Sequence, residues 1–109
     1  MSGYVLSREA EEDLFEIWAW LASEAGIEFA DRVEENLFEE FERLSRNPGL
    51  GHQRPDLTHL PVLFRRAFPF QYLVIYRRRT PLEIVAVFHA KRDISAILGG
   101  RGQAEGPNK

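Results

Sequence analysis

The sequence predicts an α+β domain in which a helical hairpin packs on a small, mostly antiparallel sheet. Two adjacent amphipathic segments, at residues 8–25 and 27–46, are separated only by Gly26, and so short a connection favours an antiparallel pair of helices. Three β-prone segments follow in the second half of the chain, and a short one precedes the helices. The predicted order of elements is therefore β-α-α-β-β-β.

The first predicted elements are a short strand at residues 4–6 and a helix over residues 8–25. Ser7 is a good N-cap, and the acidic residues after it have the sign that the helix dipole favours in its first turns. Gly26 ends the helix. The apolar residues at helical spacing are Ala10, Leu14, Ile17, Trp18, Leu21 and Ala25. Their spacing predicts an amphipathic helix that buries one face.

The second helix is predicted over residues 27–46. Arg43 and Arg46 lie in its last turn, where cations are favoured, and the sequence Asn47-Pro48-Gly49 stops it. The apolar stripe consists of Phe29 or Ala30, Val33, Leu37, Phe41 and Leu44. This stripe and that of the first helix predict one shared core.

The second half of the chain begins with a loop over residues 48–61, which glycines and prolines punctuate. Three strands are predicted after it, at residues 62–68, 70–77 and 82–88. Pro69 must lie at an edge, a bend or a bulge, because proline cannot donate a hydrogen bond to a β-ladder. These strands supply most of the sheet.

The chain closes with a predicted helical turn at residues 91–98 and a glycine-rich segment from Gly99 onward. Such a composition predicts a flexible tail. A chain of 109 residues is long enough for one hydrophobic core but not for two. We therefore expect a single domain over residues 1–98 and a flexible tail over residues 99–109.

Charge is divided unevenly along the chain, although the formal net charge is only −3. Residues 1–47 hold 4 basic and 13 acidic side chains, whereas residues 48–109 hold 10 basic and 4 acidic ones. This division predicts an acidic face and a basic face whose partners differ in charge. The acidic balance of the whole chain excludes indiscriminate nucleic-acid binding but leaves room for a local basic site.

Several classes of site are excluded by what the sequence lacks. There is no cysteine, and hence no disulfide, thiolate metal site or cysteine nucleophile. The start of the chain has no signal pattern, and no apolar run approaches the roughly 20 residues of a membrane helix. The acids Glu9, Glu12, Asp13 and Glu16 lie at helical spacing but without a histidine at a metal-ligand spacing, and we interpret them as a solvated helix face. We expect a soluble cytoplasmic protein with no metal and no cofactor.

Basic residues gather where the predicted strands end. Arg65 and Arg66 are adjacent on a strand, so their side chains point to opposite faces. His89, Lys91 and Arg92 follow an apolar strand and are presented at the edge of the sheet. Arginine grips phosphate, lysine supplies a point charge, and histidine moves protons near neutral pH. The alternative is structural: Arg92 pairs with Asp93, and His89 hydrogen-bonds within the fold.

Five motifs resemble the RelE/ParE superfamily of bacterial toxins from type II toxin–antitoxin modules, and most closely its ParE-like, plasmid-stabilisation branch. The resemblance covers about residues 4–98 and rests on the order and spacing of the motifs. They are Ala10-Glu11-Glu12-Asp13-Leu14-Phe15-Glu16-Ile17, Gly51-His52-Gln53-Arg54-Pro55-Asp56-Leu57, Arg65-Arg66-Ala67-Phe68-Pro69-Phe70, Tyr72-Leu73-Val74-Ile75-Tyr76-Arg77 and His89-Ala90-Lys91-Arg92-Asp93. The β-α-α-β-β-β layout of that superfamily agrees with the order predicted above.

The resemblance implies different targets in different branches. ParE-like members inhibit DNA gyrase, whereas RelE-like members are ribosome-dependent endoribonucleases that cleave mRNA with basic residues. The basic set that would serve a metal-independent ribonuclease here is Arg65, Arg66, His89, Lys91 and Arg92. However, no tyrosine follows Tyr76 to match the late aromatic residue of the RelE-type enzymes, and the acidic half of the chain repels ribosomal RNA.

We therefore expect a gyrase inhibitor whose target-binding residues are Arg66, His89, Lys91 and Arg92. The alternatives are the ribosome-dependent ribonuclease and a degenerate, non-toxic domain that only binds an antitoxin. The family also implies a hetero-oligomer with a cognate antitoxin, whose C-terminal segment wraps the toxin as a helix and an added strand. The candidate apolar residues for that contact are Trp20, Phe64 and Phe70. Because Trp18 and Trp20 are two residues apart, they face different ways, and we expect one in the core and one at a contact.

Overall fold

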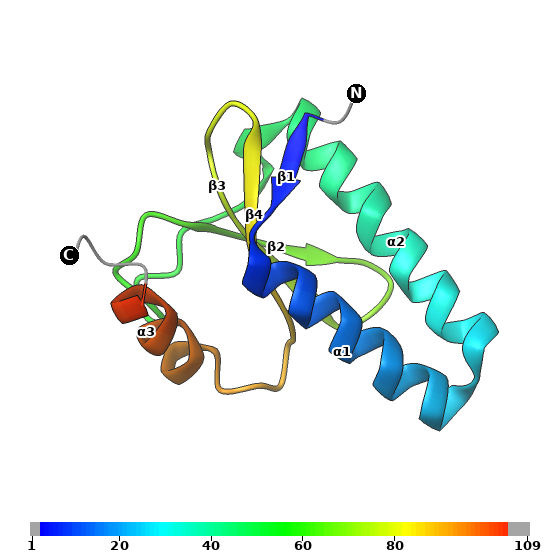
Figure 1. Cartoon of the computed structure of the whole chain (residues 1–109). Helices are drawn as coiled ribbons and strands as arrows, with labels where there is room; N and C mark the ends of the chain where they lie inside the picture. Colours follow the sequence, from blue (N-terminus) through cyan, green and yellow to red (C-terminus); the bar gives the residue numbers. More distant parts are fainter. Residues whose placement is uncertain (1–2, 105–109) are drawn as a thin grey trace.

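A computed structural model of the chain describes residues 3–104 (Figure 1). The predicted order of strands and helices is confirmed, and a third helix follows it. The elements are β1 (Tyr4–Leu6), α1 (Arg8–Ala25), α2 (Ile27–Arg46), a single 3-10 turn (Pro48–Leu50), β2 (Leu63–Ala67), β3 (Tyr72–Arg77), β4 (Leu82–His89) and α3 (Ile94–Ala104). No helix within this part of the chain is both long enough and apolar enough to cross a membrane.

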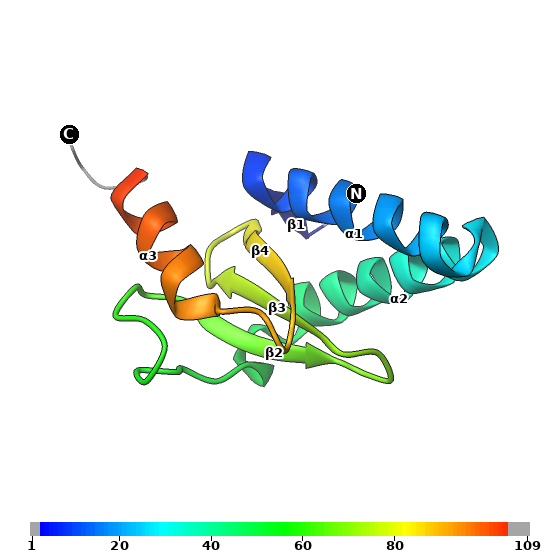
Figure 2. The same cartoon turned by 90° about the horizontal axis from the view of Figure 1, so that it is seen from below.

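The four strands form one sheet in the order β1-β4-β3-β2. β1 pairs with β4 in parallel, while the β2–β3 and β3–β4 pairs are antiparallel, so the predicted α+β class with a mostly antiparallel sheet is confirmed. The helical hairpin of α1 and α2 lies on one face of the sheet, and α3 lies toward the other (Figure 2). The register of β4 against β3 shifts between Ile75 and Tyr76, which leaves Val85 as an extra residue in β4.

The helix boundaries follow from the caps that the sequence predicts. The Ser7 side chain accepts a hydrogen bond from the Ala10 amide at 3.0 Å, and Gly26 separates α1 from α2 with a φ of 97°. An L-residue with a side chain adopts that angle only with strain, which is why glycine ends α1 and lets α2 begin at once. The two helices consequently fold back on each other as predicted.

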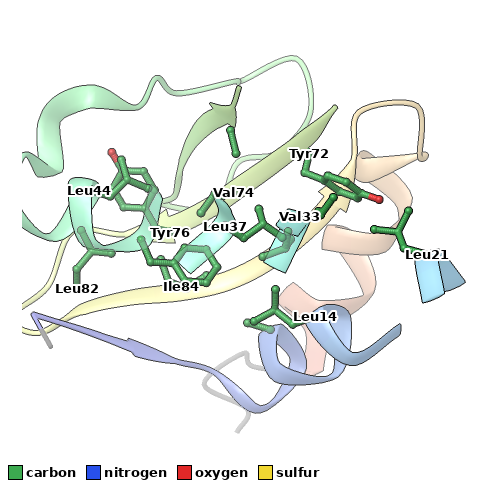
Figure 3. Packing of buried hydrophobic residues seen from close by; sticks show 14 of the residues in the cluster. Leu14, Leu21, Val33, Leu37, Leu44, Tyr72, Val74, Tyr76, Leu82 and Ile84 are labelled. Atoms are coloured by element: carbon green, nitrogen blue, oxygen red, sulfur yellow. The ribbon is translucent and has the colours of Figure 1, made fainter. Parts of the chain in front are cut away.

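Two layers of buried side chains lie on the two faces of the sheet. On the face that α1 and α2 cover, β3 and β4 contribute side chains that pack between the helices and the sheet (Figure 3). On the other face, α3 and the loop before β2 cover the remaining strand side chains. The first layer contains Leu14, Leu21, Val33, Leu37, Leu44, Tyr72, Val74, Tyr76, Leu82 and Ile84; the second contains Val62, Phe64, Ile75, Val85, Ala86, Phe88, Ile94 and Leu98.

The strands differ from their predicted bounds mainly at the β2–β3 hairpin. β3 begins at Tyr72 rather than at residue 70, because Ala67 and Tyr72 form the last pair of the β2–β3 ladder and residues 68–71 make the turn. Pro69 lies in that turn, as its missing N–H requires. The predicted position of this proline is thus confirmed as a bend.

The end of the chain holds more helix than the sequence indicates. α3 runs from Ile94 to Ala104, six residues beyond the helical turn predicted at residues 91–98. Three glycines in this segment disfavour a helix. Two features outweigh them: Ile94 and Leu98 are buried against the sheet, and Asp93 caps the helix by accepting a hydrogen bond from the Ala96 amide at 3.3 Å. Residues 105–109 of the predicted tail lie outside the described residues.

Candidate functional site

A cleft of about 600 Å³ lies between the middle of α1, the end of β4 and the first turn of α3. Four of the residues predicted from the sequence come together in it: Trp20 from α1, and His89, Lys91 and Arg92 from the end of β4 and the turn after it. The lining residues are Asp13, Glu16, Ile17, Trp20, Tyr72, Val87, Phe88, His89, Lys91, Arg92 and Ile97.

The turn after β4 sets the positions of the basic residues. The Arg92 amide donates to the His89 carbonyl at 3.0 Å, which closes a tight turn, and Lys91 and Arg92 are exposed on it. The Arg92 guanidinium lies 5.8 Å from the centroid of the Phe88 ring, a cation–π contact that orients it. Within residues 3–104, Arg92 makes no ion pair with Asp93, whose carboxylate instead caps α3.

His89 is held by the same turn and by an aromatic neighbour. Its Nδ1 accepts a hydrogen bond from the Lys91 amide at 3.1 Å, so in the neutral ring Nε2 carries the proton. The His89 ring meets the Tyr72 ring edge to face, with centroids 5.5 Å apart. Burial raises the pKa of the Tyr72 hydroxyl, so at neutral pH this group remains protonated and cannot serve as a base.

Tyr72 is a site residue that sequence reasoning missed. It belongs to a strand that precedes His89 by many residues, and the two meet because Tyr72 and His89 are partners in the β3–β4 ladder. Side chains of directly opposed strand residues lie on the same face. The signal would have been the register of the two strands, which the sequence leaves open.

The α1 side of the cleft is acidic and aromatic. Glu16 is exposed there, and Trp20 is 61 % exposed. Asp13 is only 6 % exposed, and its Oδ2 accepts from the Val87 amide at 3.0 Å. The interpretation of these acids as a wholly solvated helix face is therefore wrong for Asp13, which satisfies a strand amide. No group of three potential metal ligands occurs within residues 3–104.

The two arginines of β2 lie apart from the cleft and point to opposite faces, as predicted. The Arg65 Nε donates to Glu40 Oε2 at 3.0 Å, and that carboxylate is only 3 % exposed and also binds Arg43. Arg66 lies over the Phe68 ring, 5.3 Å from its centroid, and donates to the Gln71 side chain. Of the five basic residues proposed for ribonuclease chemistry, only His89, Lys91 and Arg92 line the cleft.

The three apolar residues proposed for antitoxin contact have different environments. Trp20 is exposed, but Phe64 is only 4 % exposed because its side chain faces the layer that α3 covers. A partner cannot reach Phe64 in this structure, so that assignment is corrected. Phe70 is partly buried and packs against the Phe29 ring, with centroids 5.6 Å apart. The exposed large apolar side chains that the sequence did not single out are Val5, Phe15, Ile27 and Phe68.

A second groove, of about 490 Å³, lies on the outer side of the helical hairpin. Trp18 is half-buried in it, and its Nε1 donates to Asp31 Oδ1 at 2.8 Å, which joins α1 to α2. The two tryptophans thus face different ways as expected. Apolar side chains and carboxylates both line this groove: Leu6, Glu11, Leu14, Phe15, Trp18, Asp31, Glu34 and Phe38.

Comparisons with known proteins agree with this architecture. Residues 4–94 match the family model described as the ParE toxin of the type II toxin–antitoxin system parDE. A curated relative, Toxin ParE1 of Caulobacter vibrioides, is 33 % identical over 99 residues, which cover 91 % of this chain and all of that protein. A solved structure of a chromosomal ParDE toxin–antitoxin system from P. aeruginosa matches with a TM-score of 0.69 and 19 % identity, over 84 % of this chain and 98 % of the other.

Proposed function

The chain belongs to the ParE family of toxins from type II toxin–antitoxin systems, and on that premise we propose that it inhibits DNA gyrase and is neutralised by a cognate antitoxin. The choice of gyrase follows from the resemblance to the ParE-like branch. Lys91, Arg92 and His89 form the target-binding surface, with Arg66 as an outlying contact. A target of this kind places the protein in the cytoplasm.

The mixed charge of the cleft is the observation that best supports a protein target. Glu16 lines the α1 side, while Lys91 and Arg92 lie on the opposite side. An RNA backbone carries negative charge throughout and is repelled by the carboxylate, whereas a peptide can place groups of either sign. Arg65 is also unavailable for RNA, because the buried Glu40 carboxylate already binds it.

The outer groove of the hairpin supports binding of an antitoxin helix. Its apolar lining includes Phe15 and Trp18, and the carboxylates of Glu11, Asp31 and Glu34 also line it. An amphipathic helix with an apolar stripe and basic flanking residues is complementary to this surface. The groove and the cleft lie on opposite sides of α1, and Trp20 lines the cleft. One antitoxin segment can therefore occupy the groove and continue toward Trp20.

The decisive experiment measures supercoiling by purified gyrase in the presence of the purified chain. We expect inhibition that the product of an adjacent antitoxin gene reverses. Arg92→Ala and Lys91→Ala should each weaken inhibition about tenfold or more, because an interfacial charge pair contributes one or more kcal/mol. Arg78→Ala is the matched control, since Arg78 is an exposed arginine in the β3–β4 turn, at the opposite end of β4.

Other results would replace the proposal. Unaffected gyrase together with codon-registered mRNA cleavage in a ribosome-coupled assay would establish the ribonuclease. Normal growth on strong expression of the folded chain, with retained antitoxin binding, would leave a non-toxic binding domain.

A further inference from the structure

Arg66 lies in one row with Phe88 across the face of the sheet that α3 covers. Arg66 is paired with Leu73 of β3, and Leu73 is paired with Phe88 of β4. Directly opposed residues of paired strands place their side chains on the same face, and Leu73 and Phe88 belong to the layer of side chains on that face. Because neighbouring strands are roughly 4.8 Å apart, the backbone of Arg66 lies only about 10 Å from that of Phe88.

A second arginine completes this row. The Arg92 guanidinium lies 5.8 Å from the centroid of the Phe88 ring, so Arg66 and Arg92 lie on the two sides of Leu73, which is half-buried. In the part of the chain that the structure describes, no carboxylate forms an ion pair with either arginine. The row is therefore an apolar strip with an uncompensated positive charge at each end.

Phe68 is held out of the fold beside Arg66. The residue is 65 % exposed, and the Arg66 guanidinium lies 5.3 Å from the centroid of its ring. The turn around it is fixed from two sides: Asn36 Nδ2 donates to the Phe68 carbonyl at 2.9 Å, and the Phe70 ring packs against the Phe29 ring. A rigid turn that presents an aromatic ring to solvent loses little conformational entropy on binding.

The turn that carries Phe68 is joined to the basic turn after β4. Arg66 donates to the Gln71 side chain, and the Gln71 carbonyl accepts from the Ala90 amide at 2.8 Å. Ala90 directly precedes Lys91, which lines the cleft. The row and the exposed ring therefore adjoin the basic side of the cleft and do not form a separate site.

We propose that the protein target binds a surface made of Arg66, Phe68, Leu73 and Arg92, the Phe68 surface, with the Phe68 ring as its apolar anchor. The proposal rests on the proposed function, because it adds residues to the surface that binds the target and joins the outlying Arg66 to it. Aromatic and arginine side chains are enriched at the energetic centres of protein interfaces. The complementary partner has an apolar hollow for the Phe68 ring and carboxylates beside it for the arginines.

The charge of the Phe68 surface favours the target over the antitoxin as its occupant. Glu11, Asp31 and Glu34 line the outer groove of the hairpin, which suits a basic antitoxin helix. The Phe68 surface has the opposite sign, and its row of side chains lies on the face of the sheet that the hairpin does not cover. Surfaces of opposite sign select different partners.

Phe68→Ala tests the anchor on the full chain, with Val5→Ala as the matched control. Val5 is another exposed apolar residue, 46 % exposed on β1, which pairs with the opposite end of β4. Phe68→Ala should weaken both binding and inhibition of purified gyrase about tenfold or more, whereas Val5→Ala should change them less than about twofold. Both variants should keep the fold by circular dichroism and bind the antitoxin with the affinity of the unmodified chain.

Two substitutions of Arg66 test the chemistry of the partner. Arg66→Ala removes a positive charge, whereas Arg66→Glu also places a negative charge opposite the expected carboxylates. Because like charges repel across an interface, the glutamate variant should bind gyrase about threefold or more weakly than the alanine variant. Equal affinities for the two variants would overturn the acidic partner. If Phe68→Ala does not fold, the comparison of these two variants decides.

The possible failures are distinct. Full inhibition by Phe68→Ala together with reduced inhibition by Arg92→Ala would overturn the Phe68 surface and leave the proposed function standing. A loss of antitoxin binding by folded Phe68→Ala as large as its loss of gyrase binding, or larger, would overturn the choice of occupant. An unmodified chain that does not bind gyrase would overturn the proposed function and the Phe68 surface with it.

Discussion

At the scale of single residues, Gly51 and Tyr76 hold the loop before β2 against the sheet. The buried Tyr76 hydroxyl donates to the Pro48 carbonyl at 2.6 Å and accepts from the Gly51 amide at 2.8 Å. A Cβ on Gly51 would lie 2.6 Å from that hydroxyl oxygen and 3.0 Å from the Phe64 carbonyl oxygen. The glycine is therefore required by the close approach of the tyrosine and of the backbone of β2.

We expect Gly51→Ala to lower the free energy of unfolding by about 2 kcal/mol, as overpacking against rigid neighbours does. Gly49→Ala is the matched control, because its Cβ would lie 3.9 Å from the nearest heavy atom, the end of the Arg78 side chain, and should change stability little. Urea denaturation of both variants measures the difference. Equal stabilities for the two variants would contradict the steric explanation.

Stability should also fall at alkaline pH. Burial raises the pKa of Tyr72 and of Tyr76 above the ordinary value of 10.0. The folded protein therefore keeps protons that the unfolded chain releases above pH 10, so this stabilisation is complete below that pH and is lost as the pH rises through the raised values. Denaturation at a series of pH values measures the loss. The double variant Tyr72→Phe, Tyr76→Phe should lose less stability as the pH rises above 10. If its free energy of unfolding falls with pH as steeply as that of the unmodified chain, the two tyrosines are not the cause of the loss.

At the scale of elements, an ion pair joins α2 to β2. Glu40 is buried on α2 and binds Arg65 of β2 and Arg43 of its own helix. A buried carboxylate needs such partners, because an unpaired buried charge is strongly destabilising. This requirement explains why Arg65, which the sequence makes a candidate for phosphate binding, serves the structure instead.

Arg65→Ala should lower the free energy of unfolding by about 2 kcal/mol, the size of a hydrogen bond to a charged group. Because Arg43 still pairs with Glu40 in this variant, the loss of stability should be smaller than for a buried carboxylate with no partner. Arg8→Ala removes an exposed pair with Glu12 and should cost less than about 0.5 kcal/mol. Thermal denaturation of the two variants compares them, and a similar small loss for both would show that the buried pair contributes little.

At the scale of the whole molecule, buried side chains cover both faces of the sheet. α1 and α2 cover one face, and α3 with the loop before β2 covers the other. Ile94 and Leu98 are the buried residues of α3 up to residue 100. The predicted domain limit at residue 98 therefore includes both of the side chains that hold α3 to the sheet.

Two truncations test that limit. A chain that ends at Leu98 should retain the fold, because it keeps Ile94 and Leu98. A chain that ends at Asp93 loses both and should be destabilised by about 4 kcal/mol or more, since burial of each such side chain contributes roughly 2 kcal/mol. Circular dichroism and denaturation distinguish the two. Unfolding of the longer form would place the domain limit beyond residue 98.

The sequence predicts the elements well because each depends on local features. Ser7, Gly26 and Pro48 set the limits of α1 and α2, and the β-prone runs mark β2 to β4. α3 was underestimated because its glycines oppose a helix locally while Ile94 and Leu98 stabilise it through the sheet. The candidate site was predicted in part: His89, Lys91, Arg92 and Trp20 meet in the cleft, whereas Arg65 and Phe64 are used inside the fold and Tyr72 went unnoticed.

By itself, the sequence determined the β-α-α-β-β-β order, the acidic and basic halves, and the family, since periodicity, caps and motifs are properties of neighbouring residues. Only the tertiary structure decided which basic residues share a cleft and which are neutralised by a buried carboxylate. It also decided that Asp13 is buried against β4, where it binds the Val87 amide. These outcomes depend on strand register and on contacts between residues far apart in the chain. Local sequence patterns do not determine which distant side chains meet, whereas strand pairing and packing across the fold do.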